Sequence, residues 1–161
     1  MIPLLPAKRS WAAAIGNFII NFGGLDYLIF DFLEVRLPPK QFAALKDKHF
    51  QDRVKRIERY VEQKNCPAET RARSAQFFAR LAPLRELRNH IAHGYLLMRL
   101  DDAGENFVLT LTLPKHLSDA FSPNSEHLSF EGLQQALTEL KELIEECRQL
   151  SEILTPAVQS P

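Results

Sequence analysis

The chain has 161 residues, of which 45% are hydrophobic and 25% are charged, a composition that suits one compact domain and excludes wholesale disorder. Its net charge is zero, but residues 1–100 hold 17 Lys and Arg against 9 Asp and Glu, and residues 101–161 hold 3 against 11. The first part is therefore +8 and the second −8, which fits either a basic face for an anionic partner or solvated helix faces of opposite sign.

The two cysteines, Cys66 and Cys147, lack a C-x-x-C spacing, which indicates reduced thiols in a cytosolic protein rather than a disulfide framework or a zinc site. Lys8 and Arg9 precede an apolar stretch and resemble the start of a signal peptide. Polar residues interrupt that stretch, however, and no cleavage site follows it. Asp26 also arrives too early for a transmembrane span. A soluble, cytoplasmic protein without a membrane partner is therefore expected.

The first predicted element is a helix over about 11–35, with Ser10 as its N-cap and Pro38 and Pro39 after its end. Apolar residues recur along it in steps of three and four, as on one broad face of a helix. That face comprises Ile15, Phe18, Ile19, Phe22, Leu25, Ile29, Phe32 and Leu33.

A second stripe on this helix, Gly16, Ile20, Gly23 and Tyr27, follows steps of four, three and four. A helix that is apolar on more than one side is buried on more than one side. The glycines would let another backbone approach closely. The second stripe is therefore interpreted either as further core or as a subunit interface.

A second helix is expected over about 40–64, before the break at Asn65, Cys66 and Pro67. Its polar face is basic: Lys46, Lys48, Arg53, Lys55, Arg56 and Arg59. Because no aromatic residues interleave with these cations, stacking on single-stranded bases is not supported. The face is interpreted as solvated or as a contact for an acidic partner such as the acidic last helix.

A third helix is expected over about 68–93, with Gly94 as a left-handed C-cap. Two β-prone runs, YLLMRL and FVLTLTL, then flank DDAGEN and predict a hairpin over about 95–113. A fourth helix is expected over about 129–155, with Ser129 as its N-cap. The fold class is thus all-α, an antiparallel four-helix bundle with a hairpin between helices 3 and 4, in one domain over 1–161.

Near the end of the third helix, the sequence RNHIAHGY places Arg88 and Asn89 before His93. On an ideal helix Arg88 lies about 140° from His93, towards the leucine side, whereas Asn89 and His93 share a face. The helix dipole favours the protonated form of His93 in the last turn, and a cation backed by an amide can handle phosphate. The structural alternative pairs Arg88 with Asp26 or Asp31 and makes His93 a helix terminator.

His90 and His93 are three residues apart, which is compatible with metal ligation. The other histidines are scattered along the chain and supply no evident third ligand, so no metal site is expected. No glycine-rich phosphate loop or Ser-His-Asp set is present, and no cofactor is expected.

The stretch RNHIAHG at the end of a third helix resembles the signature of the HEPN superfamily, Arg-x4–6-His in a small all-α domain. The resemblance extends over the helical plan of about residues 10–155. It implies a metal-independent endoribonuclease, toxin-like or defence-associated, in which His93 is the acid–base group, Arg88 stabilises the transition state and Asn89 orients the histidine or the phosphate. RNA would be cleaved by attack of the 2′-hydroxyl, leaving a 2′,3′-cyclic phosphate.

The resemblance also implies a homodimer with a composite site, for which the stripe of Gly16, Ile20, Gly23 and Tyr27 is the candidate interface. Arg88, His93 and Tyr95 further match the Arg-x4-His-x-Tyr form of HEPN toxins, in which a nucleotidyltransferase antitoxin adenylylates the tyrosine. The predicted hairpin departs from that subgroup, and Tyr95 otherwise opens a strand. The alternative function is a non-catalytic HEPN scaffold that dimerises or binds a partner protein.

Overall fold

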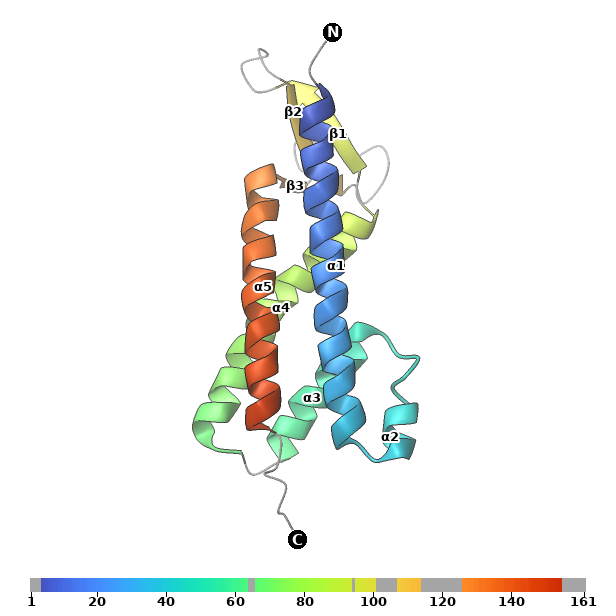
Figure 1. Ribbon diagram of the computed structural model, residues 1–161, viewed down its shortest axis with the longest axis vertical. Helices are drawn as coiled ribbons and strands as arrows, with labels where there is room; N and C mark the ends of the chain where they lie inside the picture. The colour runs from blue at the N-terminus through green and yellow to red at the C-terminus, as the bar shows by residue number, and fades with distance from the viewer. Residues whose placement is uncertain (1–3, 64–65, 94, 101–106, 114–125, 155–161) are drawn as a thin grey trace. The chain divides into compact units, whose positions relative to one another are not determined.

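The computed structural model describes residues 4–63, 66–93, 95–100, 107–113 and 126–154, and it is mainly helical, as the sequence predicted (Figure 1). The helices are α1 (Leu4–Arg36), α2 (Pro39–Ala43), α3 (Phe50–Gln63), α4 (Ala68–His93) and α5 (Phe130–Ile153). The strands are β1 (Tyr95–Leu100), β2 (Phe107–Leu113) and β3 (Glu126–Leu128).

The chain forms two compact units, each built from two segments. Unit 1 comprises Met1–Ile20 and Pro83–Leu140, and unit 2 comprises Asn21–Ala82 and Lys141–Pro161. Helices α1, α4 and α5 each continue from one unit into the other. The single domain predicted over 1–161 stays a prediction.

Helix α1 begins at Leu4, so Ser10 lies inside the helix and its assignment as the N-cap was wrong. Pro6 stands in the first turn, where backbone N–H groups have no intrahelical partner, so the proline costs no hydrogen bond there. The first apolar stripe supplies most of the helix's buried residues. These are Trp11, Ala14, Phe18, Phe22, Leu25, Ile29, Phe32 and Leu33.

By length and composition, the segment Ser10–Arg36 of α1 is long and apolar enough to cross a membrane. Within its most apolar stretch of 18 residues, 28% is buried inside the protein. The sequence predicted that Asp26 rules out a transmembrane span, and that prediction does not hold for this segment. Core helices of soluble proteins and signal sequences have the same length and composition. The cytoplasmic location stays a prediction.

In unit 2, the helix predicted over 40–64 is two helices, α2 and α3, separated by a turn, so that prediction was wrong. Each of the two helices has an aromatic contact to α1. Phe42 of α2 packs edge-on against Phe30, with ring centroids 4.8 Å apart, and Phe50 opens α3 against Phe22 at 5.0 Å.

A long-range ion pair stabilises the turn between α2 and α3. The Arg53 guanidinium donates to both carboxylate oxygens of Asp26, at 2.6 and 2.7 Å, and to the carbonyl of Lys48 at 2.6 Å. In a continuous helix the Lys48 carbonyl would accept from the backbone N–H of Asp52. Here that N–H donates to the backbone carbonyl of His49 instead, at 3.0 Å. Because Asp26 is far away in the sequence, local periodicity could not predict this break.

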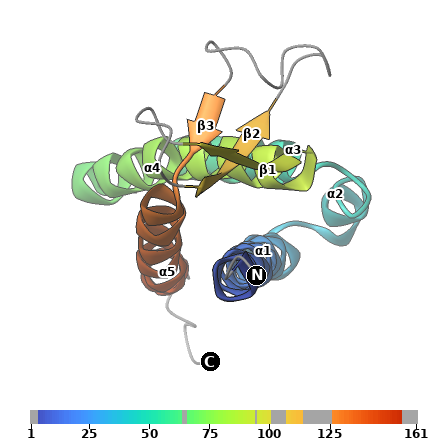
Figure 2. The same ribbon diagram turned by 90° about the horizontal axis from the view of Figure 1, so that it is seen from above.

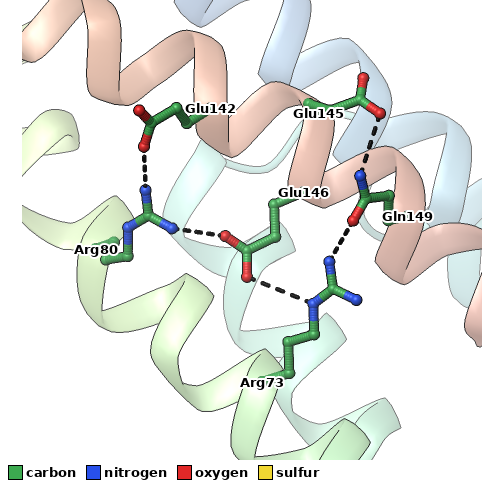
Figure 3. A network of polar contacts seen from close by, with 6 residues as sticks. All are labelled: Arg73, Arg80, Glu142, Glu145, Glu146 and Gln149. Atoms are coloured by element: carbon green, nitrogen blue, oxygen red, sulfur yellow. Dashed lines mark hydrogen bonds and ion pairs between the residues drawn. The ribbon is translucent and has the colours of Figure 1, made fainter.

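A polar network joins α4 to α5 in unit 2 (Figure 3). Arg80 of α4 bridges Glu142 at 3.0 Å and Glu146 at 2.8 Å, and Arg73 lies 3.7 Å from the other Glu146 oxygen. Arg73 also donates to Gln149. The acidic face of α5 therefore pairs with α4, and not with the basic face of α3 as the sequence suggested.

In unit 1, the strands form one antiparallel sheet in which β2 lies between β1 and β3 (Figure 2). β1 and β2 pair from Tyr95 with Thr112 to Leu100 with Phe107, in the stretch where the sequence predicted a hairpin. The short strand β3 was not predicted; in it, Leu128 pairs with Leu111 of β2.

Helix α5 starts in unit 1 with a side-chain cap. The N–H of Gly132 donates to the hydroxyl of Ser129 at 3.0 Å, as expected of a serine N-cap. A Cβ on Gly132 would lie 3.2 Å from Leu128 Cδ1, so a side chain there would crowd the end of β3. Trp11 packs edge-on against Phe130, with ring centroids 5.4 Å apart, and so fixes the first turn of α5 against α1.

Candidate site at the end of helix α4

Arg88 and Asn89 lie exposed near the end of α4. Arg88 Nη1 donates to Asn89 Oδ1 at 3.3 Å. The expectation that Arg88 turns towards the buried leucines was wrong, because its long side chain extends into solvent. Its proposed pairing with Asp26 or Asp31, which both belong to unit 2, stays a prediction; Asp26 is bound by Arg53.

His93 is the last residue of α4 and is exposed. It lies four residues after Asn89, so the two side chains leave the same face of the helix. Among the described residues, no hydrogen bond joins His93 to Asn89 or to Arg88. The three groups therefore lie at one helix end, open to solvent. Apart from the contact between Arg88 and Asn89, no described hydrogen bond fixes their arrangement.

Gly94 and Tyr95 follow the helix, and the structure describes only the backbone of Tyr95. Gly94, predicted as a left-handed cap, lies outside the described residues. Tyr95 is the first residue of β1, where its backbone pairs with Thr112, and its side chain lies outside the described part of the structure. The role predicted for Tyr95 as a modification site stays a prediction.

The second stripe of α1 is exposed. Ile20 is 73% exposed and Tyr27 66%. A Cβ placed on Gly16 or on Gly23 would have no described atom within 4 Å other than those of its own helix backbone and chain neighbours. Open glycines and exposed large apolar side chains are not packed, so no described part of the chain makes this stripe part of a core. The stripe remains a candidate interface.

Metal binding finds no structural basis in the part of the chain that is described. No group of three His, Cys, Asp or Glu side chains comes together among residues 10–63, 66–93 and 128–154. His90 is half-buried and His93 exposed.

A pocket of about 490 Å³ in unit 2 was not anticipated from the sequence. It lies between α3 and α4, and its wall includes Glu58, Glu62 and Ser74. The spacing of the two glutamates, one helical turn apart beside a basic helix face, was the signal available in the sequence.

Comparison with known proteins finds no family model that matches the chain, no similar curated protein and no similar solved structure. The HEPN resemblance therefore depends on the Arg88, Asn89 and His93 motif and on the helical plan of this chain alone.

Proposed function

We propose that this chain is a metal-independent endoribonuclease of HEPN type, toxin-like or defence-associated, in which Arg88, Asn89 and His93 act on the RNA phosphodiester. The observation that carries the proposal is their shared position, exposed at the end of a 26-residue helix. An RNA backbone can reach groups at an exposed helix end without a conformational change. The finer fold assignment, a HEPN-type four-helix bundle, belongs to the same proposal.

In the proposed reaction, neutral His93 accepts the proton of a ribose 2′-hydroxyl as its oxygen attacks the adjacent phosphorus. The bond to the 5′-oxygen breaks, and that oxygen takes a proton from a protonated histidine. An imidazole suits both steps because its ordinary pKa lies near neutrality. Arg88 stabilises the negative charge that develops on the phosphoryl oxygens. Asn89 orients the histidine or the phosphate, and its contact with Arg88 keeps its amide at the site.

A homodimer would complete the site. His93 in one chain has no described hydrogen-bond partner, and one histidine cannot be base and acid at the same instant, so a second chain's motif would supply the missing group. Isologous pairing about a two-fold axis brings identical motifs together. The exposed face of α1, formed by Gly16, Ile20, Gly23 and Tyr27, is the surface available for this association.

A nucleotidyltransferase antitoxin is the proposed regulatory partner if Tyr95 is the target of adenylylation. Tyr95 follows the motif by two residues. A bulky, negatively charged adenylyl group so close to His93 would repel an RNA phosphate. Incubation with the cognate enzyme and ATP would then add one adenylyl group, detectable by mass, and Tyr95→Phe would accept none.

The test of the catalytic proposal is RNA cleavage by EDTA-treated protein, with analysis of the product ends. Wild type should cleave a mixed pool of cellular RNA and leave 2′,3′-cyclic phosphates. His93→Ala and Arg88→Ala should each lower the rate by about a hundredfold or more, because an acid–base group or a fixed cation is lost.

The matched control is His49→Ala, which removes an exposed histidine from the turn before α3. It should cleave as wild type does. Equal cleavage by wild type and His93→Ala would show that His93 is not catalytic, and the mechanism would be dropped.

A non-catalytic scaffold is the second candidate, favoured by the absence of any described hydrogen bond that fixes His93 in place. Active sites usually hold their catalytic side chains by packing and hydrogen bonds. A scaffold would leave cellular RNA intact and would associate equally well as wild type and as His93→Ala. Silence of the wild type in the RNA assay would favour this candidate.

A further inference from the structure

The pocket between α3 and α4 in unit 2 has the size of a small-molecule site, at about 490 Å³. Its apolar part is formed by Val61 of α3 and by Ala75, Phe78 and Ala79 of α4. Phe78 is held in place by an edge-on contact with Phe77, with ring centroids 5.2 Å apart. The pocket therefore offers a fixed aromatic ring and a small apolar surface.

Two carboxylates on the pocket wall have no described ion-pair partner. Glu58 and Glu62 lie one turn apart on α3, so their side chains leave the same face. Arg71 lines the same pocket, yet no ion pair joins it to either glutamate among the described residues. Elsewhere in unit 2 Asp26, Glu142 and Glu146 are all paired with arginines. Two glutamates against one arginine leave this lining with a net charge of −1.

Ser74 adds an unpartnered polar group. Ser74 belongs to the pocket lining, the residue is 3% exposed, and its buried hydroxyl has no hydrogen-bond partner among the described residues. A buried hydroxyl without a partner is costly, so such groups in proteins are nearly always satisfied. A ligand that donates a hydrogen bond to Ser74 would remove that cost.

Two carboxylates and a hydroxyl oxygen together call for a ligand that donates hydrogen bonds and carries positive charge.

We propose that this pocket binds a small organic cation, a primary ammonium or guanidinium group on a short apolar chain. The cationic group lies between Glu58 and Glu62, and its N–H groups also reach Ser74. The apolar chain lies on Val61 and against Phe78, where burial of its methylene groups adds to the attraction. This site is independent of the RNA-cleaving proposal.

The test is an amide chemical-shift titration of the full chain with three six-carbon probes: hexylammonium, hexanol and hexanoate. Hexylammonium should give saturable shifts in residues 58–62 and 71–79. Hexanol, which has the same chain without the charge, should bind at least about threefold more weakly, and hexanoate should not bind there, because the lining is anionic.

Variants separate charge from shape. Glu58→Gln and Glu62→Gln should each weaken hexylammonium binding by about threefold and together by about tenfold, since each removes one partly exposed ion pair. The matched control is Glu34→Gln, which removes an exposed carboxylate of α1 outside the pocket and should bind as wild type does. For all of these variants, amide chemical shifts that match those of wild type away from the pocket would show that the protein folds.

Three results would each overturn the proposal. The first is the absence of saturable shifts at residues 58–62 and 71–79. The second is equal binding of hexylammonium and hexanol. The third is unchanged binding in the double variant, which would show that the carboxylates do not hold the ligand.

Discussion

At the scale of single residues, burial gives the two cysteines different chemistry. Cys147 on α5 is buried, and desolvation raises its pKa to about 11; Arg148 lowers it and Glu146 raises it by smaller amounts. Cys66, just before α4, is half-buried. Since the thiolate is the reactive form, Cys147 should be inert to thiol reagents at mildly alkaline pH.

We therefore expect one fast-reacting thiol in the native protein at pH about 8, where a buried thiol with a raised pKa is protonated. Reaction with an aromatic disulfide reagent should release one equivalent rapidly and the second only on unfolding. Cys66→Ser should abolish the fast phase, and Cys147→Ala should leave it unchanged. Two fast equivalents would contradict the assignment.

The same pKa affects stability at high pH. An unfolded cysteine titrates at about 8.5, whereas folded Cys147 titrates at about 11, so the folded state holds its proton longer. The stabilisation from the protonated thiol is present below pH about 8.5 and is lost as pH rises through the folded value. Cys147→Ala should show a smaller loss of unfolding free energy across that range than wild type.

At the scale of the element, both ends of α5 are satisfied by side chains. Ser129 accepts from the N–H of Gly132 at the first turn, and Arg36 Nη2 donates to the carbonyl of Ser151 in the last turn at 2.6 Å. The end groups of a helix have no intrahelical partners, so such caps stabilise it. Arg36 is itself held over the Phe32 ring, 4.0 Å from its centroid.

Loss of the first cap should be measurable. Ser129→Ala should lower the free energy of unfolding by about 1 kcal/mol, because the N–H of Gly132 loses its acceptor. Ser129→Asp keeps a capping oxygen and should remain within a few tenths of a kcal/mol of wild type. Denaturant titrations of the three proteins measure this. Equal losses in both variants would show that Ser129 acts through packing rather than as a cap.

Helices α2, α3 and α4 show how far sequence reasoning reaches at this scale. The predicted and observed bounds of α4 coincide because Pro67 and Gly94 flank one continuous helical pattern. The break between α2 and α3 carries no proline or glycine. The contacts of Arg53 with Asp26 and with the Lys48 carbonyl accompany it, and local patterns do not encode a contact over that distance in the chain.

At the scale of the whole molecule, the exposed face of α1 predicts self-association. Tyr27→Asp should convert a dimer of 18.4 kDa chains into a monomer, raising the dissociation constant by about tenfold or more, because it places a charge in an apolar contact. Ile153→Asp is the matched control, since Ile153 is 50% exposed on a different helix. Analytical ultracentrifugation measures the masses. A wild type that stays monomeric at high concentration would exclude the interface.

Gly23→Ala separates folding from association. In one chain its methyl group meets no described atom within 4 Å outside its own helix backbone and chain neighbours. The substitution should therefore stabilise the folded monomer by about 0.5–1 kcal/mol, because alanine has a lower conformational entropy than glycine in the unfolded chain. At an interface that needs close backbone approach, the same methyl group should weaken the dimer. A variant that is more stable and more monomeric than wild type would support the interface.

The sequence by itself determined the helical character of the chain, the bounds of α4, the cap at Ser129 and the Arg88, Asn89 and His93 motif. These follow from local rules, since hydrophobic period, capping and motif spacing involve residues close together in the chain. Only the tertiary structure decided which stripe of α1 is left exposed, that α4 and not α3 pairs with the acidic α5, and that Glu58, Glu62 and Ser74 share a pocket. Each of these depends on which distant segments meet, because burial and ion pairing are set by contacts between elements.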